Sequence, residues 1–101
     1  MAKLTADSWH VEQLSQLLHE RGAKHLRARK HGSLLIIESG PENDPWHHAR
    51  LRRDTVHLWS LDMPGCGGRW ERTPFRGQMV ELVDLLFEQF SWVLANFDEA
   101  R

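Results

Sequence analysis

The stretch KHLRARKHGSLLIIE, residues 24–38, decides the fold because its pattern is that of a β-hairpin. In its first half, Leu26 and Ala28 alternate with basic residues, which gives a strand one thin apolar face and one basic face. The second half, residues 34–38, is almost wholly apolar, as in a central strand. Gly32 lies between the halves, where a turn is needed. We therefore expect two antiparallel strands joined by a tight turn.

Further strands are expected after the hairpin. Residues 40–45 are a loop by their glycine, proline, asparagine and aspartate content. Residues 46–53 predict a short strand, because apolar and basic side chains alternate there, and residues 56–61 predict a better one. Glycines make residues 64–68 the most flexible stretch, and residues 69–75 predict a last short strand. The chain thus holds three to five strands in succession.

Two helices flank these strands. In residues 8–21, apolar side chains recur on one face of a 3.6-residue repeat, and Gly22 suits the position just past a helix end. Residues 78–90 show the same spacing, and the pattern continues to about residue 96. The side chains of the second helix that we expect to be buried against the sheet share a four-residue spacing: Leu82, Leu86 and Phe90.

The order of helix, strands and helix predicts an α+β domain, in which an antiparallel sheet of three to five strands carries both helices on one face. A chain of 101 residues suits a single domain, residues 1–101. Folding would bury about 65% of its surface, which is enough for one core without staples. The 1 Cys excludes an intramolecular disulfide and a four-cysteine zinc site.

Charge is distributed unevenly along the chain. The formal net charge is -1, which argues against a generally basic nucleic-acid binder. Nevertheless, residues 1–53 hold 9 Lys/Arg against 6 Asp/Glu, and residues 54–101 hold 4 against 8. The longest apolar run, residues 34–37, is far too short to cross a membrane, and no secretory signal is visible. We therefore expect a cytoplasmic protein.

Basic side chains cluster in residues 21–31 and again in residues 50–53. If the two segments are neighbours, their charges form a patch that can meet phosphates. The alternative is that the charges protect an edge strand against aggregation. We expect Arg27 and Arg29 to face solvent, because they alternate with apolar residues. The candidate nucleic-acid-binding residues are Arg21, Lys24, Arg27, Arg29, Lys30, Arg50, Arg52 and Arg53.

The second helix carries more apolar surface than one contact face needs. Either the helix is wedged between the sheet and the first helix, or the surplus forms an interface with a partner or a second copy. Tryptophan anchors such interfaces, and Trp46 is the one we most expect to be exposed, because its segment is polar and proline-flanked. The candidate interface residues are Trp46, Phe87, Trp92 and Phe97.

Residues able to carry chemistry are few. The adjacent His47 and His48 would point to opposite faces of a strand, so they cannot easily share a metal ion. Cys66 lies among glycines, and nothing in the sequence places beside it the base that a nucleophilic thiol requires. The sequence therefore predicts no catalytic residue, no metal site and no cofactor, and it leaves the role of these three side chains open.

Together these features favour a small cytoplasmic binding or accessory protein that acts through protein–protein interaction, self-association included. The first alternative is nucleic-acid binding through residues 21–31 together with residues 50–53. The second alternative is a small enzyme whose site forms at a subunit interface.

Overall fold

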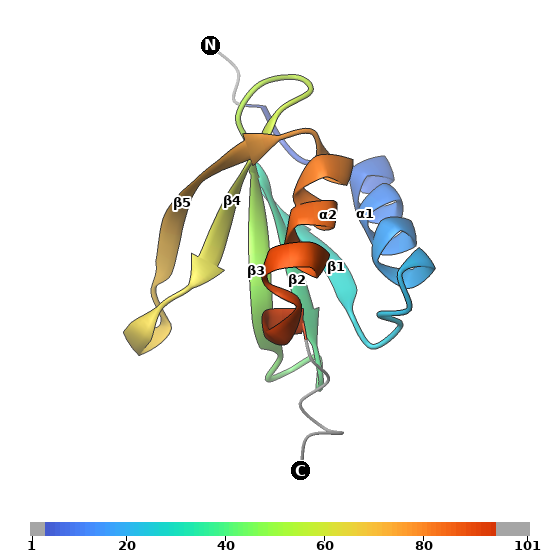
Figure 1. Cartoon of the computed structure of the whole chain (residues 1–101), viewed down its shortest axis with the longest axis vertical. Helices are drawn as coiled ribbons and strands as arrows, with labels where there is room; N and C mark the ends of the chain where they lie inside the picture. The colour runs from blue at the N-terminus through green and yellow to red at the C-terminus, as the bar shows by residue number, and fades with distance from the viewer. Residues whose placement is uncertain (1–3, 95–101) are drawn as a thin grey trace.

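The computed structural model describes residues 4–94, in which a helix, five strands and a second helix follow one another (Figure 1). Their bounds are α1 (Ser8–Glu20), β1 (Arg27–His31), β2 (Leu34–Ser39), β3 (Trp46–Arg53), β4 (Trp59–Pro64), β5 (Trp70–Gly77) and α2 (Met79–Gln89). Two short 3-10 turns, η1 (Cys66–Gly68) and η2 (Ser91–Leu94), follow β4 and α2. Within the described residues, no helix is long and apolar enough to cross a membrane.

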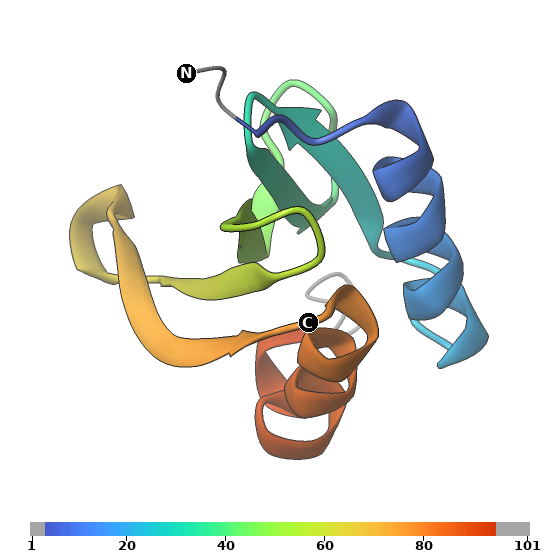
Figure 2. The ribbon, with the colours of Figure 1, turned by 90° about the horizontal axis from the view of Figure 1, so that it is seen from above.

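The five strands form one antiparallel sheet in the order β1-β2-β3-β4-β5, so each strand pairs with its neighbour in sequence. The sheet is curved, and both helices lie on the same side of it (Figure 2). The expected α+β class and the single antiparallel sheet are confirmed.

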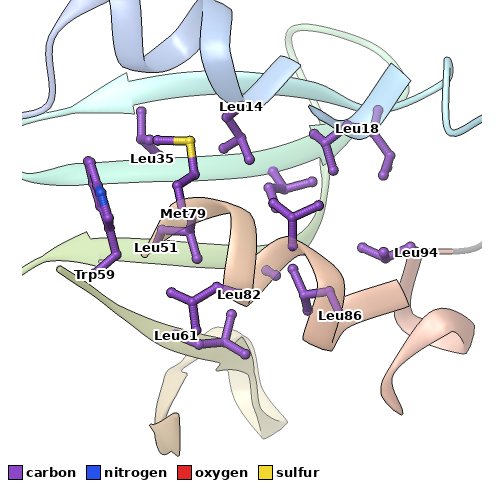
Figure 3. Close-up of a cluster of buried hydrophobic side chains, with 14 of the residues drawn as sticks. Leu14, Leu18, Leu35, Leu51, Trp59, Leu61, Met79, Leu82, Leu86 and Leu94 are labelled. Carbon is purple, nitrogen blue, oxygen red and sulfur yellow. The ribbon is translucent and has the colours of Figure 1, made fainter. Parts of the chain in front are cut away.

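The core lies between the two helices and the sheet (Figure 3). Leu14 and Leu18 of α1 and Leu82 and Leu86 of α2 are buried there, so the predicted burial of the last two is confirmed. Each of the three central strands contributes alternate side chains to this face, as the two-residue period of a strand requires. Those side chains are Leu35, Ile37, Ala49, Leu51, Trp59 and Leu61.

β4 begins later than the sequence predicts, at Trp59 instead of residue 56. The preceding residues form a turn, in which the backbone N–H groups of Asp54 and Thr55 both donate to the carbonyl of Leu58. The Thr55 hydroxyl in turn accepts the N–H of Leu58 at 3.2 Å. Val56 therefore lies in a loop and is 56% exposed, because a closed turn cannot pair as a strand.

α2 ends at Gln89, so its predicted continuation to about residue 96 is wrong as far as the structure describes the chain, to residue 94. Phe90 leaves the helical conformation with φ -130° and is only half-buried. The chain then turns back toward the sheet as η2, where Leu94 re-enters the core at 4% exposure. A 3-10 turn also directs apolar side chains inward every third residue, which is why periodicity alone could not separate it from a longer helix.

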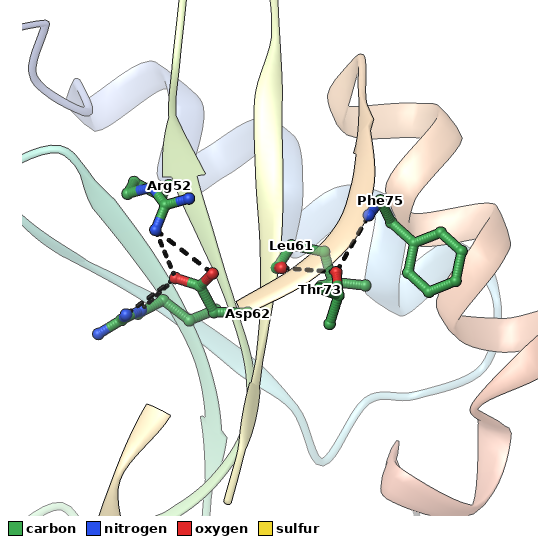
Figure 4. Close-up of polar contacts among 6 residues, drawn as sticks. Arg52, Leu61, Asp62, Thr73 and Phe75 are labelled. Atoms are coloured by element: carbon green, nitrogen blue, oxygen red, sulfur yellow. Dashed lines mark hydrogen bonds and ion pairs between the residues drawn. The ribbon is translucent and has the colours of Figure 1, made fainter. Parts of the chain in front are cut away.

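β4 and β5 are joined irregularly, with a shift of register between Ser60 and Asp62. Pro74 lies within β5 and has no N–H to donate to the ladder. The Thr73 hydroxyl replaces part of the missing backbone hydrogen bonding. It donates to the Leu61 carbonyl at 2.8 Å and accepts the N–H of Phe75 (Figure 4).

Candidate nucleic-acid interface

The face of the sheet away from the helices is rich in arginine. Because Leu51 and its core neighbours point toward the helices, the residues between them point the other way. Pairing across all five strands places one row of side chains on this face. The row is Arg29, Ile36, Arg50, Asp62 and Arg72.

The register puts six arginines on this face, which we name the arginine face: Arg27, Arg29, Arg50, Arg52, Arg72 and Arg76. Three carboxylates contact these arginines, two from the face itself and Asp54 from the loop after β3. Asp54 pairs with Arg76 at 2.5 Å. The face therefore carries a surplus of three positive charges although the whole chain has a formal net charge of -1.

Asp62 is the most deeply buried carboxylate of the arginine face, with no exposed surface. Arg50 donates from Nε and from a terminal nitrogen to Asp62 Oδ2, at 3.0 and 2.8 Å. Arg52 reaches the same carboxylate from the other side at 3.3 Å (Figure 4). One carboxylate thus holds two guanidinium groups in fixed positions, which is the arrangement that pre-organises arginine for a further anion.

Glu38 likewise holds two arginines, at the other side of the face. Its side chain is 3% exposed, and it accepts from Arg29 Nε at 2.7 Å and from Arg27 at 3.0 Å. Burial alone would raise the pKa of the Glu38 carboxyl, but the hydrogen bonds from Arg29 and Arg27 outweigh it and hold the pKa below its usual value. Glu38 is therefore ionised at neutral pH and keeps both arginines oriented.

Several donors of the arginine face have no partner among residues 4–94. Arg29 donates through Nε alone, so its two terminal nitrogens make no hydrogen bond within residues 4–94. Arg72 makes no ion pair in the described part of the chain and is exposed. These groups are available to an anionic ligand.

An aromatic ring completes the face. Trp70, the first residue of β5, lies under the guanidinium of Arg50, whose carbon is 4.7 Å from the ring centroid. The ring of His47 is 5.8 Å from that of Trp70. A cation stacked on an indole keeps its N–H edge free, so Arg50 can meet a phosphate without leaving Trp70.

The predicted basic residues divide into two groups. Arg27, Arg29, Arg50 and Arg52 come together on the arginine face, and the first two lie on its exposed side with side chains 35% and 48% exposed. The others lie elsewhere. Arg53 donates to the carbonyls of Thr5 and Val56 on the opposite side of the sheet, Arg21 pairs with Asp84 between the helices, and Lys24 and Lys30 are exposed away from the face.

Sequence reasoning missed Trp70, Arg72 and Arg76. All three alternate along β5, so the period of two was present in the sequence. Pro74 interrupts that pattern and hid it.

The predicted interface residues do not form one surface. Trp46 is half-buried against Gly40, and Phe87 is half-buried with Arg21 above its ring at 6.0 Å. Trp92 is 72% exposed on η2. Phe97 lies outside the described residues.

A separate apolar patch, which the sequence analysis did not find, gathers the exposed side chains of Trp9, Val56 and Val80 around one shallow pocket. His10 lies beneath them, with its ring 3.7 Å from that of Trp9, and is 2% exposed. Burial lowers the pKa of His10, and the charge of Arg53 lowers it further, so the ring is neutral at neutral pH.

The two adjacent histidines diverge, as their strand position predicts. His48 is buried, where Nε2 lies 2.7 Å from the Ser39 hydroxyl and Nδ1 2.7 Å from the Val93 carbonyl. His47 is exposed beside Trp70, and Cys66 is exposed in η1. In residues 4–94, no three His, Cys, Asp or Glu side chains are placed to hold a metal ion together.

Comparison of the chain with protein-family models, curated proteins and solved structures finds no match. Any functional assignment therefore depends on the geometry of the structure itself.

Proposed function

We propose that this protein binds single-stranded nucleic acid on the arginine face. The observation that carries the proposal is the surplus of three positive charges that six arginines leave on one helix-free sheet face. The chain as a whole has a formal net charge of -1, so the positive charge is concentrated on this face.

The spacing of the arginines suits a chain of phosphates. Arg27 and Arg29 lie two residues apart on β1, and Arg50 and Arg52 two residues apart on β3, a separation of about 7 Å along each strand. Successive phosphates of an extended single strand have a similar step. The guanidinium fork matches phosphate oxygens in two-point hydrogen bonds, and the buried carboxylates beneath fix its direction.

The shape of the site favours a single strand over a duplex. Readers of the duplex major groove insert a helix or a two-stranded ribbon, whereas this face is a five-stranded sheet. Single-strand binders combine cationic side chains with aromatic rings on which unpaired bases stack. Trp70 places an aromatic ring on this face, stacked against the Arg50 guanidinium.

A salt titration tests the proposal. Fluorescein-labelled single-stranded DNA and RNA should bind in fluorescence anisotropy, with an affinity that falls as salt rises. The double variant Arg29→Ala/Arg72→Ala should weaken binding and reduce the salt slope by roughly two units, about one per lost phosphate contact. Its matched control is Lys24→Ala/Lys30→Ala, which removes the same charge away from the face. Absence of binding at about 50 mM salt, or an equal loss in the control, would contradict the proposal.

Protein–protein interaction is the second candidate function, supported by the apolar patch of Trp9, Val56 and Val80. Exposed apolar side chains that gather around one pocket are a feature of protein–protein interfaces. A solution mass above that of one chain, measured by sedimentation, would identify the partner as a second copy. We also propose a cytoplasmic location, because a reducing compartment suits the exposed thiol of Cys66.

A further inference from the structure

A cleft opens beside the arginine face because β3 and β4 separate. Their pairing runs from Arg53↔Trp59 to Arg50↔Asp62 and ends there. β3 begins four residues earlier, at Trp46, and β4 continues to Pro64, with no β3–β4 pairing in these described segments. Figure 1 shows β4 and β5 leaning away from β3 in this region.

The cleft has a volume of about 510 Å³. It is lined by His47, Met63, Pro64, Glu71, Phe90, Trp92 and Val93, of which only the histidine and the glutamate are polar. Trp92 is 72% exposed, so most of its indole is not used by the core. The site is therefore mainly apolar, with the rings of Phe90 and Trp92 from the segment after α2 and two polar groups.

The cleft lies beside the arginine face, and His47 lies between the two. His47 lines the cleft, and its ring is 5.8 Å from that of Trp70, which in turn carries the guanidinium of Arg50 at 4.7 Å. A ligand held by Arg50 thus lies next to the mouth of an aromatic pocket. Phosphate and planar ring at neighbouring positions are the two parts of a nucleotide.

We infer that the cleft takes one unstacked base of the strand that the arginine face holds, an inference that rests on the proposed function. The base stacks on Trp92, and its polar edge meets the ring nitrogens of His47 and the carboxylate of Glu71. A flat ring with a polar edge fits this lining better than an aliphatic chain, because the aromatic rings contact it face-on and both polar groups gain a partner.

The test compares two labelled oligonucleotides that share one sugar-phosphate backbone, one with bases and one abasic throughout. The inference predicts that the oligonucleotide with bases binds about tenfold more tightly, in the range expected for stacking of one base. Trp92→Ala should remove most of that preference and leave the affinity for the abasic chain unchanged. Trp92 is exposed, so its removal leaves the buried core intact.

Trp9→Ala is the matched control, since Trp9 is also an exposed tryptophan, 57% accessible, and α1 begins at the opposite end of the molecule from η2 (Figure 1). It should leave the preference unchanged. As a second readout, an oligonucleotide containing 2-aminopurine should lose fluorescence on binding to the wild type and keep it on binding to Trp92→Ala.

The possible failures are distinguishable. Equal, salt-dependent binding of both oligonucleotides overturns the base-binding cleft and leaves the arginine face as a site for the backbone alone. No binding of either oligonucleotide overturns the proposed function and the cleft together. If Trp92→Ala instead lowers the solution mass and does not change the preference for bases, the cleft is an interface between copies of this chain.

Discussion

Two buried carboxylates, Asp62 and Glu38, set the geometry of the arginine face. Each is almost fully covered, and each holds two arginines that are only partly exposed. Removing one carboxylate leaves two like charges beside each other with no counter-charge between them. The arginines are therefore positioned by two buried carboxylates that a ligand would not touch.

Asp62→Asn should lower the free energy of unfolding by about 1–3 kcal/mol, because it takes the counter-charge from Arg50 and Arg52 while the buried amide keeps the shape. Asp54→Asn, which breaks an exposed pair with Arg76, should cost less than about 1 kcal/mol. Urea unfolding of both variants measures the difference. Equal effects would show that Asp62 does not organise the face.

Stability should also depend on pH through His48. Burial lowers the pKa of this imidazole in the folded protein, the hydrogen bond to the Val93 carbonyl acts in the raising direction, and the neighbouring His25 and His47 lower it further. The folded state therefore binds the proton less readily than the unfolded state, whose pKa is near 6.5. Burial also lowers the pKa of His10, so His10 should change the stability with pH in the same direction.

The free energy of unfolding should consequently have its full value above about pH 6.5. Below that pH it should fall as the pH approaches the lowered pKa of the folded state, by at most about 1.4 kcal/mol per pH unit for each of the two histidines. In His48→Gln the slope in this window should become shallower. Urea unfolding at several pH values measures it. An unchanged slope in the variant would assign the pH dependence to other groups.

At the scale of elements, the sequence predicts the helices and central strands well and their ends less well. α1 occupies nearly the predicted residues because Asp7 and Gly22 mark both of its ends. The predicted end of α2 and the predicted start of β4 were wrong, since both positions depend on tertiary contacts. η2 is held by the histidine bonds to Val93 and Leu94, which no local pattern reveals.

α2 supplies the clearest packing prediction. Leu86 has no exposed surface, so Leu86→Ala should lower the free energy of unfolding by about 2–5 kcal/mol through lost burial and a cavity. Val80→Ala on the same helix is a matched control, because Val80 is 39% exposed and its loss should cost less than about 1 kcal/mol. Thermal or urea unfolding measures both. Similar losses for the two would contradict the packing of α2 against the sheet.

At the scale of the whole molecule, the meander brings together arginines that lie far apart in the chain. Four of the six were visible in the sequence as basic residues alternating with apolar ones, on segments that became β1 and β3. The remaining two, with Trp70, lie on β5, where Pro74 and the shifted register conceal the alternation. The cleft could not be predicted, because it depends on where β3 and β4 stop pairing, and nothing in either strand's own residues marks that point.

The most direct test of the central claim, that the arginine face binds single-stranded nucleic acid, is an NMR titration that follows side-chain N–H signals as a short single strand is added. If the arginine face binds the strand, the Nε–H signals of Arg29 and Arg50 and the indole N–H of Trp70 should shift, while those of Arg53 and Trp9 stay in place. Shifts confined to Trp9 and Arg53, or no shift at a saturating concentration of the strand, would contradict it.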